Sequence, residues 1–177
     1  EYVPEPKVEQ GPFRMLVTTI ERNAFLGRLL TGRIFSGSVK AGDAIHSLSR
    51  DGKEIEKGRV SKVLAFRGLE RTPIEVAEAG DIIAIAGLEE STVANTITIP
   101  QNNEPLPAKP IDPPTLSVTF RINDGPLAGR EGDKVQSRVI RDRLLREAEG
   151  NVAIRVTEGT DSDSFEVAGR GELQLAV

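Results

Sequence analysis

The chain has 177 residues, of which 38% are hydrophobic and 28% are charged, a composition typical of globular domains and not of disordered chains. It contains no cysteine, which excludes disulfides and thiol catalysis, and no apolar run approaches the roughly 20 residues of a membrane-spanning helix. The net charge of −4 weighs against binding of nucleic acid by bulk positive charge. A cytoplasmic protein that binds neither membrane nor DNA is the simplest interpretation.

The first part of the chain is predicted to form an antiparallel β-barrel. Residues 1–12 are rich in proline and are expected to be an extended lead-in from an upstream domain, and residues 13–100 contain only strand and turn signals. Strands about 8 to 12 residues apart, without a helical period, predict a barrel of six to eight strands. The expected strands include 14–20, 27–35, 44–49, 57–66 and 82–86, and the glycines within them mark bulges or bends.

Two local features of the barrel lead to specific expectations. The Asp-Gly pair within Arg50–Lys53 predicts a hairpin closed by a type I′ turn. His46 is the single histidine, so a histidine relay or a site with several histidine ligands is excluded. We expect His46 to face solvent from a strand.

The second part is predicted to be a small α+β domain. Residues 101–114 contain five prolines and are expected to be a stiff linker at the domain boundary. Residues 115–177 are expected to form, in this order, a strand, a helix, a hairpin and the start of a second helix. This order predicts a ferredoxin-like split β-α-β domain. The helix is expected over 132–149, ending at Gly150, with one apolar face; that face carries Ser137, Ile140, Leu144 and Ala148. Because the sequence stops within the last helix, we expect this domain to be incomplete at its C-terminus.

No motif for catalysis or cofactor binding is found. The chain lacks both the G-x-x-x-x-G-K-[ST] loop and the G-x-G-x-x-G fingerprint, so no catalytic, cofactor-binding or metal site is predicted. The acidic residues around 158–166 lack the spacing of a calcium loop.

Two groups of basic residues are the candidate binding sites. The barrel group comprises Lys40, Lys62, Arg67 and Arg71, and the second-domain group comprises Arg130, Lys134, Arg138 and Arg170. Either group is compatible with ordinary solvated surface or with a footprint for RNA phosphates. With one tyrosine and no tryptophan, phosphate contacts rather than stacking must dominate any binding of RNA.

Several segments resemble a known family. Residues 27–34, 39–43 and 79–82 resemble the second-domain barrel of the translational GTPases, which include EF-Tu, EF-G and LepA. Residues 120–132 and 169–173 resemble the TypA/BipA branch, and Arg170 between two glycines favours that branch over EF-G, in which methionine is usual. Gln174 departs from the pattern, since histidine is usual there.

The resemblance implies that the chain supplies the second and third domains of such a GTPase. GTP and Mg²⁺ would then bind an upstream GTPase domain, and further domains would follow Val177. The expected role is non-catalytic: binding ribosomal RNA and ribosomal proteins, and relaying nucleotide state, in ribosome assembly, translation and adaptation to stress. Two alternatives remain at this point, an equivalent piece of EF-G or LepA, and a free-standing barrel adaptor that binds a protein partner without RNA.

Overall fold

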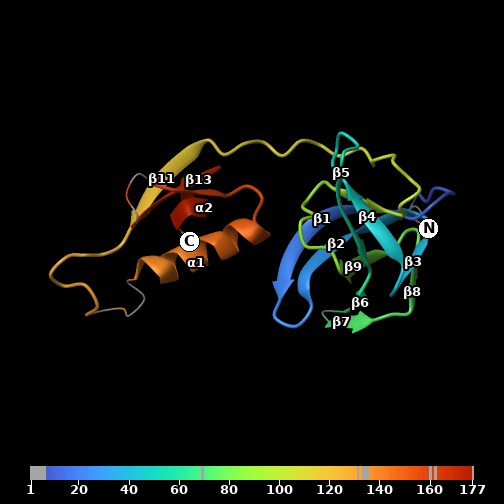
Figure 1. Ribbon diagram of the computed structural model, residues 1–177, viewed down its shortest axis with the longest axis horizontal. Coiled ribbons are helices and arrows are strands. Elements are labelled where there is room, and N and C mark those ends of the chain that lie inside the picture. Colours follow the sequence, from blue (N-terminus) through green and yellow to red (C-terminus); the bar gives the residue numbers. More distant parts are fainter. Residues whose placement is uncertain are drawn as a thin grey trace. The chain divides into compact units, whose positions relative to one another are not determined.

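The computed structural model describes residues 7–68, 70–130, 132, 136–159, 161 and 163–176 (Figure 1). Two compact units, Glu1–Pro110 and Ile111–Val177, make up the chain, and each is described by itself. The first is built almost entirely of strands, and the second combines helices with a small sheet. This confirms the predicted fold class.

The first unit is an antiparallel β structure. Its main sheet has eight strands in the order β5-β4-β10-β1-β2-β9-β6-β7, and β3 pairs with β8 in a separate sheet. The strands are β1 (Arg14–Asn23), β2 (Gly27–Ser36), β3 (Ser38–Lys40), β4 (Ala44–Leu48), β5 (Glu54–Arg59), β6 (Lys62–Arg67), β7 (Glu70–Pro73), β8 (Val76–Glu78), β9 (Ile82–Ala86) and β10 (Thr96–Thr98).

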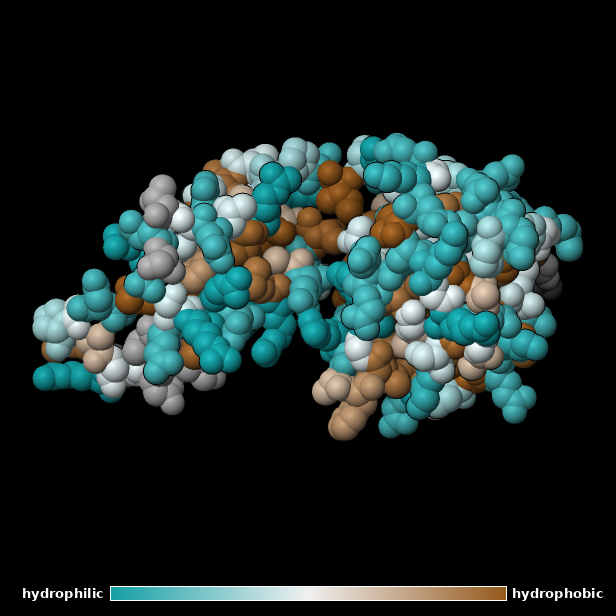
Figure 2. All heavy atoms as spheres, in the orientation of Figure 1, coloured by the Kyte–Doolittle hydropathy of each residue, from teal (hydrophilic) through white to brown (hydrophobic). Residues whose placement is uncertain are grey.

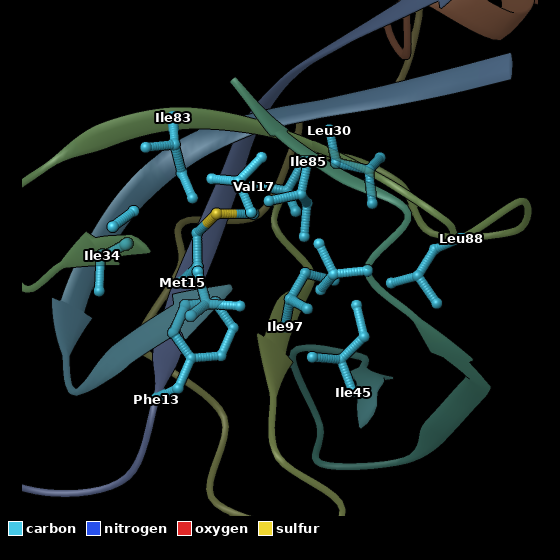
Figure 3. Close-up of a cluster of buried hydrophobic side chains, with 14 of the residues drawn as sticks. Phe13, Met15, Val17, Leu30, Ile34, Ile45, Ile83, Ile85, Leu88 and Ile97 are labelled. Carbon is cyan, nitrogen blue, oxygen red and sulfur yellow. The ribbon is translucent and has the colours of Figure 1, made fainter. Parts of the chain in front are cut away.

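The main core lies on the concave face of this sheet. Ile45 of β4 and Val63 of β6, which are well separated in the sheet order, belong to one buried cluster, so the sheet curls around its apolar side chains (Figure 3). The labelled members in Figure 3 are Phe13, Met15, Val17, Leu30, Ile34, Ile45, Ile83, Ile85, Leu88 and Ile97. Curling of this kind is what a barrel requires.

A second, smaller cluster covers the other face of three strands. It contains Leu29, Leu64, Ala84 and Ala86, with Leu26 packed against it. Because successive side chains in a strand point to opposite faces, β2 and β9 contribute to both clusters. This explains why their residues are buried without the alternation of a half-exposed strand.

The predicted strand over 57–66 is wrong, because the chain changes neighbours within it. β5 pairs with β4 and ends at Arg59, whereas β6 begins at Lys62 and pairs with β9. At this crossing Gly87 approaches the backbone closely: its φ is +125°, and a Cβ there would lie 2.0 Å from the Arg59 carbonyl oxygen. The expected bulge is confirmed at Gly32, which pairs with Val17 where the β1–β2 register shifts.

The β4–β5 hairpin is present, but its predicted type I′ turn is wrong. That turn requires positive φ at two successive residues, and among residues 49–53 only Gly52 has it, at +78°. The Gly52 N–H donates to the Ser49 carbonyl, and the Ser49 N–H donates to the Lys53 carbonyl. A longer loop with glycine in the left-handed position satisfies these bonds while allowing Asp51 to keep negative φ.

His46 does not face solvent, so that expectation is also wrong. Its side chain is fully buried in β4, with Nδ1 3.1 Å from Glu54 Oε2 and Nε2 2.7 Å from the Asn102 carbonyl oxygen. Each ring nitrogen of His46 therefore lies within hydrogen-bond distance of an oxygen acceptor. The hydrogen bonds from His46 and then Lys57 lower the pKa of Glu54.

The first residues of the predicted linker are attached to the barrel. Besides accepting from His46, Asn102 donates from its side-chain amide to Thr98 Oγ1 at 3.0 Å. Leu106 is buried, and its N–H donates to Thr96 Oγ1 at 2.8 Å. The proline-rich stretch is therefore fixed to β4 and β10 over its first part.

The second unit has a three-stranded antiparallel sheet in the order β11-β13-β12. Its elements are β11 (Leu116–Arg121), α1 (Ser137–Gly150), β12 (Arg155–Glu158), β13 (Ser164–Gly169) and α2 (Glu172–Ala176). Phe120 and Val167 of the sheet line one hollow together with Leu144 of α1 and Leu173 of α2, which places both helices on the same face.

The long helix carries the predicted face but contains no buried residue. Ser137, Ile140, Leu144 and Ala148 are half-buried. Gly150, expected to end the helix, is its last helical residue, and Asn151 caps it by donating its N–H to the Glu147 carbonyl. Residues 131 and 133–135, at the expected start of the helix, lie outside the described residues.

Candidate nucleic-acid interface

The predicted barrel group does not come together as one strip. Lys62 is the first residue of β6 and Arg67 the last, and both are exposed. Their odd spacing places them on opposite faces of a regular strand. Lys40 is exposed on β3, in the other sheet, beside Val76 of β8. The structure describes no hydrogen bond or ion pair from the Lys62 or Arg67 side chain to another described residue.

Arg71 has a structural function. Its guanidinium forms an ion pair with Glu21 of β1 and lies 5.1 Å from the centroid of the Phe66 ring. The hydrogen bond between Arg71 and Glu21 raises the pKa of the arginine and lowers that of the glutamate. Because its charge is compensated by Glu21, Arg71 is less suited to a phosphate contact than Arg67.

In the second unit, Arg138 is available for contacts with a partner. Its side chain is 90% exposed, and its Nε lies 4.0 Å from Asp142 Oδ2, a contact at the limit of an ion pair. Arg130 is also exposed, and its backbone N–H donates to the Leu127 carbonyl. Lys134 lies outside the described residues.

Arg170 shapes the turn between β13 and α2. Its guanidinium donates to the Asp112 carbonyl at 2.8 Å, and its backbone N–H donates to Gln174 Oε1 at 2.8 Å. Both interactions are internal to the second unit. They tie the end of the proline-rich stretch to the strand-to-helix turn, and they give Gln174 a local structural function.

Sequence reasoning missed an exposed aromatic residue. Phe25, in the turn between β1 and β2, is 95% exposed. The glycine and asparagine nearby indicated a turn, but nothing in the pattern showed which neighbouring side chain would point outward. Figure 2 shows pale brown and brown atoms together at the end of the barrel where β1 and β2 are joined in Figure 1.

Across the ranges that the structure describes, no group of three or more His, Cys, Asp or Glu residues could hold a metal ion. In the same ranges, no helix has the length and apolar character to cross a membrane. The hollow of about 620 Å³ beside α1 and α2 is lined largely by apolar side chains, such as Leu144, Val167 and Leu173.

Comparisons with known proteins agree with this architecture. Residues 27–98 match the family model of elongation factor Tu domain 2. A solved structure from Thermus thermophilus superposes with a TM-score of 0.64 at 19% identity, covering 94% of this chain and 23% of that one. At this identity the likeness shows the fold alone. The barrel and the family match show that the first unit has the fold of the second domain of elongation factor Tu.

Relatives with higher identity match nearly the whole chain. The large ribosomal subunit assembly factor BipA of Synechocystis sp. is 46% identical over 177 residues, which are 99% of this chain and 30% of the relative. The proteins of the same name from Salmonella typhimurium and Escherichia coli K12 are 46% and 44% identical, covering 100% of this chain and 29% of theirs. The chain belongs to the BipA (TypA) family, as the resemblance indicated, and spans about 30% of the length of these relatives.

Proposed function

We propose that this chain is the part of a BipA-type factor that binds the ribosome during assembly of the large subunit. The observation that carries the proposal is the 44 to 46% identity along the whole chain to proteins named large ribosomal subunit assembly factors. The same identity favours BipA over EF-G or LepA. Ribosomal RNA and ribosomal proteins are the proposed partners, which would place the protein in the cytoplasm.

Exposed cations are the proposed contacts with RNA phosphates. In the barrel, Lys62 and Arg67 are exposed without a described partner, and Lys40 is exposed on the second sheet. In the second unit, Arg138 is almost fully exposed, and Arg130 and Lys134 belong to the same proposal. Phosphate contacts of this kind position a protein on RNA without reading its sequence.

Two of the eight predicted cations are less suited to contact RNA phosphates, because their side chains are already bonded within the chain. Arg71 is paired with Glu21, and Arg170 is bonded to Asp112. Their removal is therefore proposed to act on folding first and on RNA only indirectly. The remaining six residues form the set to test.

GTP hydrolysis with Mg²⁺ is proposed for the whole protein and not for this chain. We further propose that the chain relays nucleotide state between a GTPase domain and the ribosome, and that the whole protein acts in translation and in adaptation to stress. The two compact units joined by a proline-rich stretch support the relay, because a stiff connector between two compact bodies transmits reorientation.

The test measures association of the full-length protein with ribosomes and ribosomal subunits over a range of salt concentrations. The variant Lys62→Ala/Arg67→Ala removes two proposed contacts. The matched control is Arg50→Ala/Lys53→Ala, which removes the same charge from the β4–β5 turn. We expect weaker binding and a shallower salt dependence for the first variant only, since each phosphate contact contributes to the salt slope.

The alternative function, a barrel adaptor that binds protein without RNA, predicts a different result. A salt-insensitive complex with a single protein, with no co-sedimentation with ribosomes, would support the adaptor. Equal binding by both variants and by the unmodified protein would contradict the assignment of the barrel cations.

A further inference from the structure

The turn that joins β1 to β2 presents one aromatic ring to solvent. Phe25 is 95% exposed, more than any other large hydrophobic side chain in the described ranges. The chain has six phenylalanines, and two of the others, Phe13 and Phe165, are buried in the cores of the two units. An exposed ring of this size is the kind of side chain that binding surfaces use as an anchor.

The backbone that carries Phe25 is held in a defined conformation. Asn23 Oδ1 accepts the N–H groups of Phe25 and Leu26 at 2.9 and 3.1 Å, and Gly27 adopts a φ of +71°. Leu26 packs against the smaller apolar cluster. With Leu26 held inward and the backbone bonded to Asn23, the turn presents the neighbouring ring outward from a fixed base.

Positive charge lies at the base of this turn. Arg22 of β1 and Arg28 of β2 are directly opposite each other in the register, so their side chains leave the same face of the hairpin. The Arg28 guanidinium donates to the Glu89 carbonyl. The Glu89 carboxylate reaches the same turn, because one of its oxygens lies 3.9 Å from the position of a Cβ on Gly27.

We propose that Phe25 stacks on an unpaired base of ribosomal RNA, while Arg28 approaches the adjacent phosphate. This proposal rests on the proposed ribosome binding and names the contact that the barrel makes there. An aromatic face combined with nearby arginine is the usual means of holding an unstacked base. A protein pocket would instead require an apolar rim around the anchor, and the hairpin offers the small Ala24, the two arginines and Leu26, which is partly buried against the smaller apolar cluster.

Substitutions at this position separate stacking from simple burial of an apolar group. In the full-length protein, Phe25→Trp and Phe25→Tyr keep a π-face, Phe25→Leu keeps apolar volume without one, and Phe25→Ala removes both. Affinity is measured for purified ribosomes and for protein-free ribosomal RNA at fixed salt. We expect Trp and Tyr to bind like the original, and Leu and Ala to bind about 5- to 150-fold more weakly. Because Phe25 is exposed, thermal unfolding should be unchanged in all four variants.

Each outcome decides between partners. A Leu variant that binds as tightly as the original would overturn stacking and indicate an apolar protein pocket. A photo-crosslinking phenylalanine analogue at position 25 should form adducts with RNA nucleotides, and adducts confined to a ribosomal protein would also overturn the proposal. If the unmodified protein binds neither ribosomes nor ribosomal RNA, both this inference and the proposed function fail. If the Phe25 variants behave as expected but the Lys62→Ala/Arg67→Ala variant binds like the original, the proposed phosphate contacts of Lys62 and Arg67 are wrong and the stacking proposal stands.

Discussion

The carboxylate of Glu56 accepts two hydrogen bonds from Ser91, one from its backbone N–H at 2.6 Å and one from its hydroxyl. The N–H groups of Glu89 and Glu90 donate to the same carboxylate, each at 2.9 Å. Three successive backbone donors thus converge on one side chain of β5. Burial raises the pKa of Glu56, but the hydrogen bonds outweigh it and the pKa is lowered overall.

The first prediction concerns this carboxylate. Glu56→Gln should lower the free energy of unfolding by about 1 to 3 kcal/mol, because the amide nitrogen presents donors to the backbone N–H groups. Denaturant unfolding measures the effect. Glu70→Gln on β7 is the matched control, since it makes the same change at an exposed carboxylate. Equal stability of the two variants would show that the loop does not depend on Glu56.

The second prediction is a loss of stability in acid. The folded pKa values of Glu21, Glu54 and Glu56 lie below the ordinary value of 4.5, so they stabilise the fold above that pH. As the pH falls through the folded pKa values, these groups become protonated and their contribution disappears. Near neutral pH, we expect these groups to cause no change in the denaturant concentration at the unfolding midpoint. At pH values below about 4.5, that concentration should decrease. Glu56→Gln should show a smaller acid-induced drop than the unmodified protein, and an identical drop would contradict the assignment.

The third prediction separates two neighbouring arginines. Arg71→Ala should lower the free energy of unfolding by about 1 kcal/mol, because it removes both the Glu21 ion pair and the contact with Phe66. Arg67→Ala should change stability by less than about 0.5 kcal/mol while weakening ribosome binding. A double-mutant cycle of Arg71→Ala with Glu21→Gln should be non-additive. Additive effects would show that the ion pair contributes nothing.

The fourth prediction concerns the anchor at Asp112. Arg170→Ala should increase amide hydrogen exchange around residues 111–115 about 5-fold or more, since one hydrogen bond of about 1 kcal/mol is lost. Arg138→Ala, which removes an exposed arginine with no bond to this segment, is the control and should leave exchange unchanged. Exchange that is equally slow in both variants would indicate that the segment is held by other contacts.

Much of the barrel could be predicted from local sequence, because β-branched runs and glycines at bends determine strands by themselves. The wrong predictions concern features that depend on contacts between segments far apart in the sequence. Nothing local marks the switch of neighbours between Arg59 and Lys62, since both halves of that stretch are good strand sequences. Burial of His46 depends on Glu54 and Asn102, which reach it only when the sheet has curled.

The candidate binding residues could also be predicted only in part, because their contacts depend on distant parts of the chain. Counting charges identified the basic residues but could not show that Glu21 neutralises Arg71, 50 residues away in sequence. Low aromatic content argued against stacking on composition alone, yet stacking depends on where a ring lies. One ring at a hairpin tip, such as Phe25, has no compositional signature.

The attachment of Asn102 and Leu106 to the barrel shortens the part of the proline-rich stretch that has no described anchor. Arg170 fixes Asp112 in the second unit, so residues 107–111 are the stretch between the two anchors. Fully extended at about 3.3 to 3.6 Å per residue, the six steps from Leu106 to Asp112 span at most about 22 Å. The segment between the two anchors is therefore short. Loss of either hydrogen bond, through a substitution at Thr96 or Arg170, would lengthen it without changing any residue of the proline-rich stretch itself.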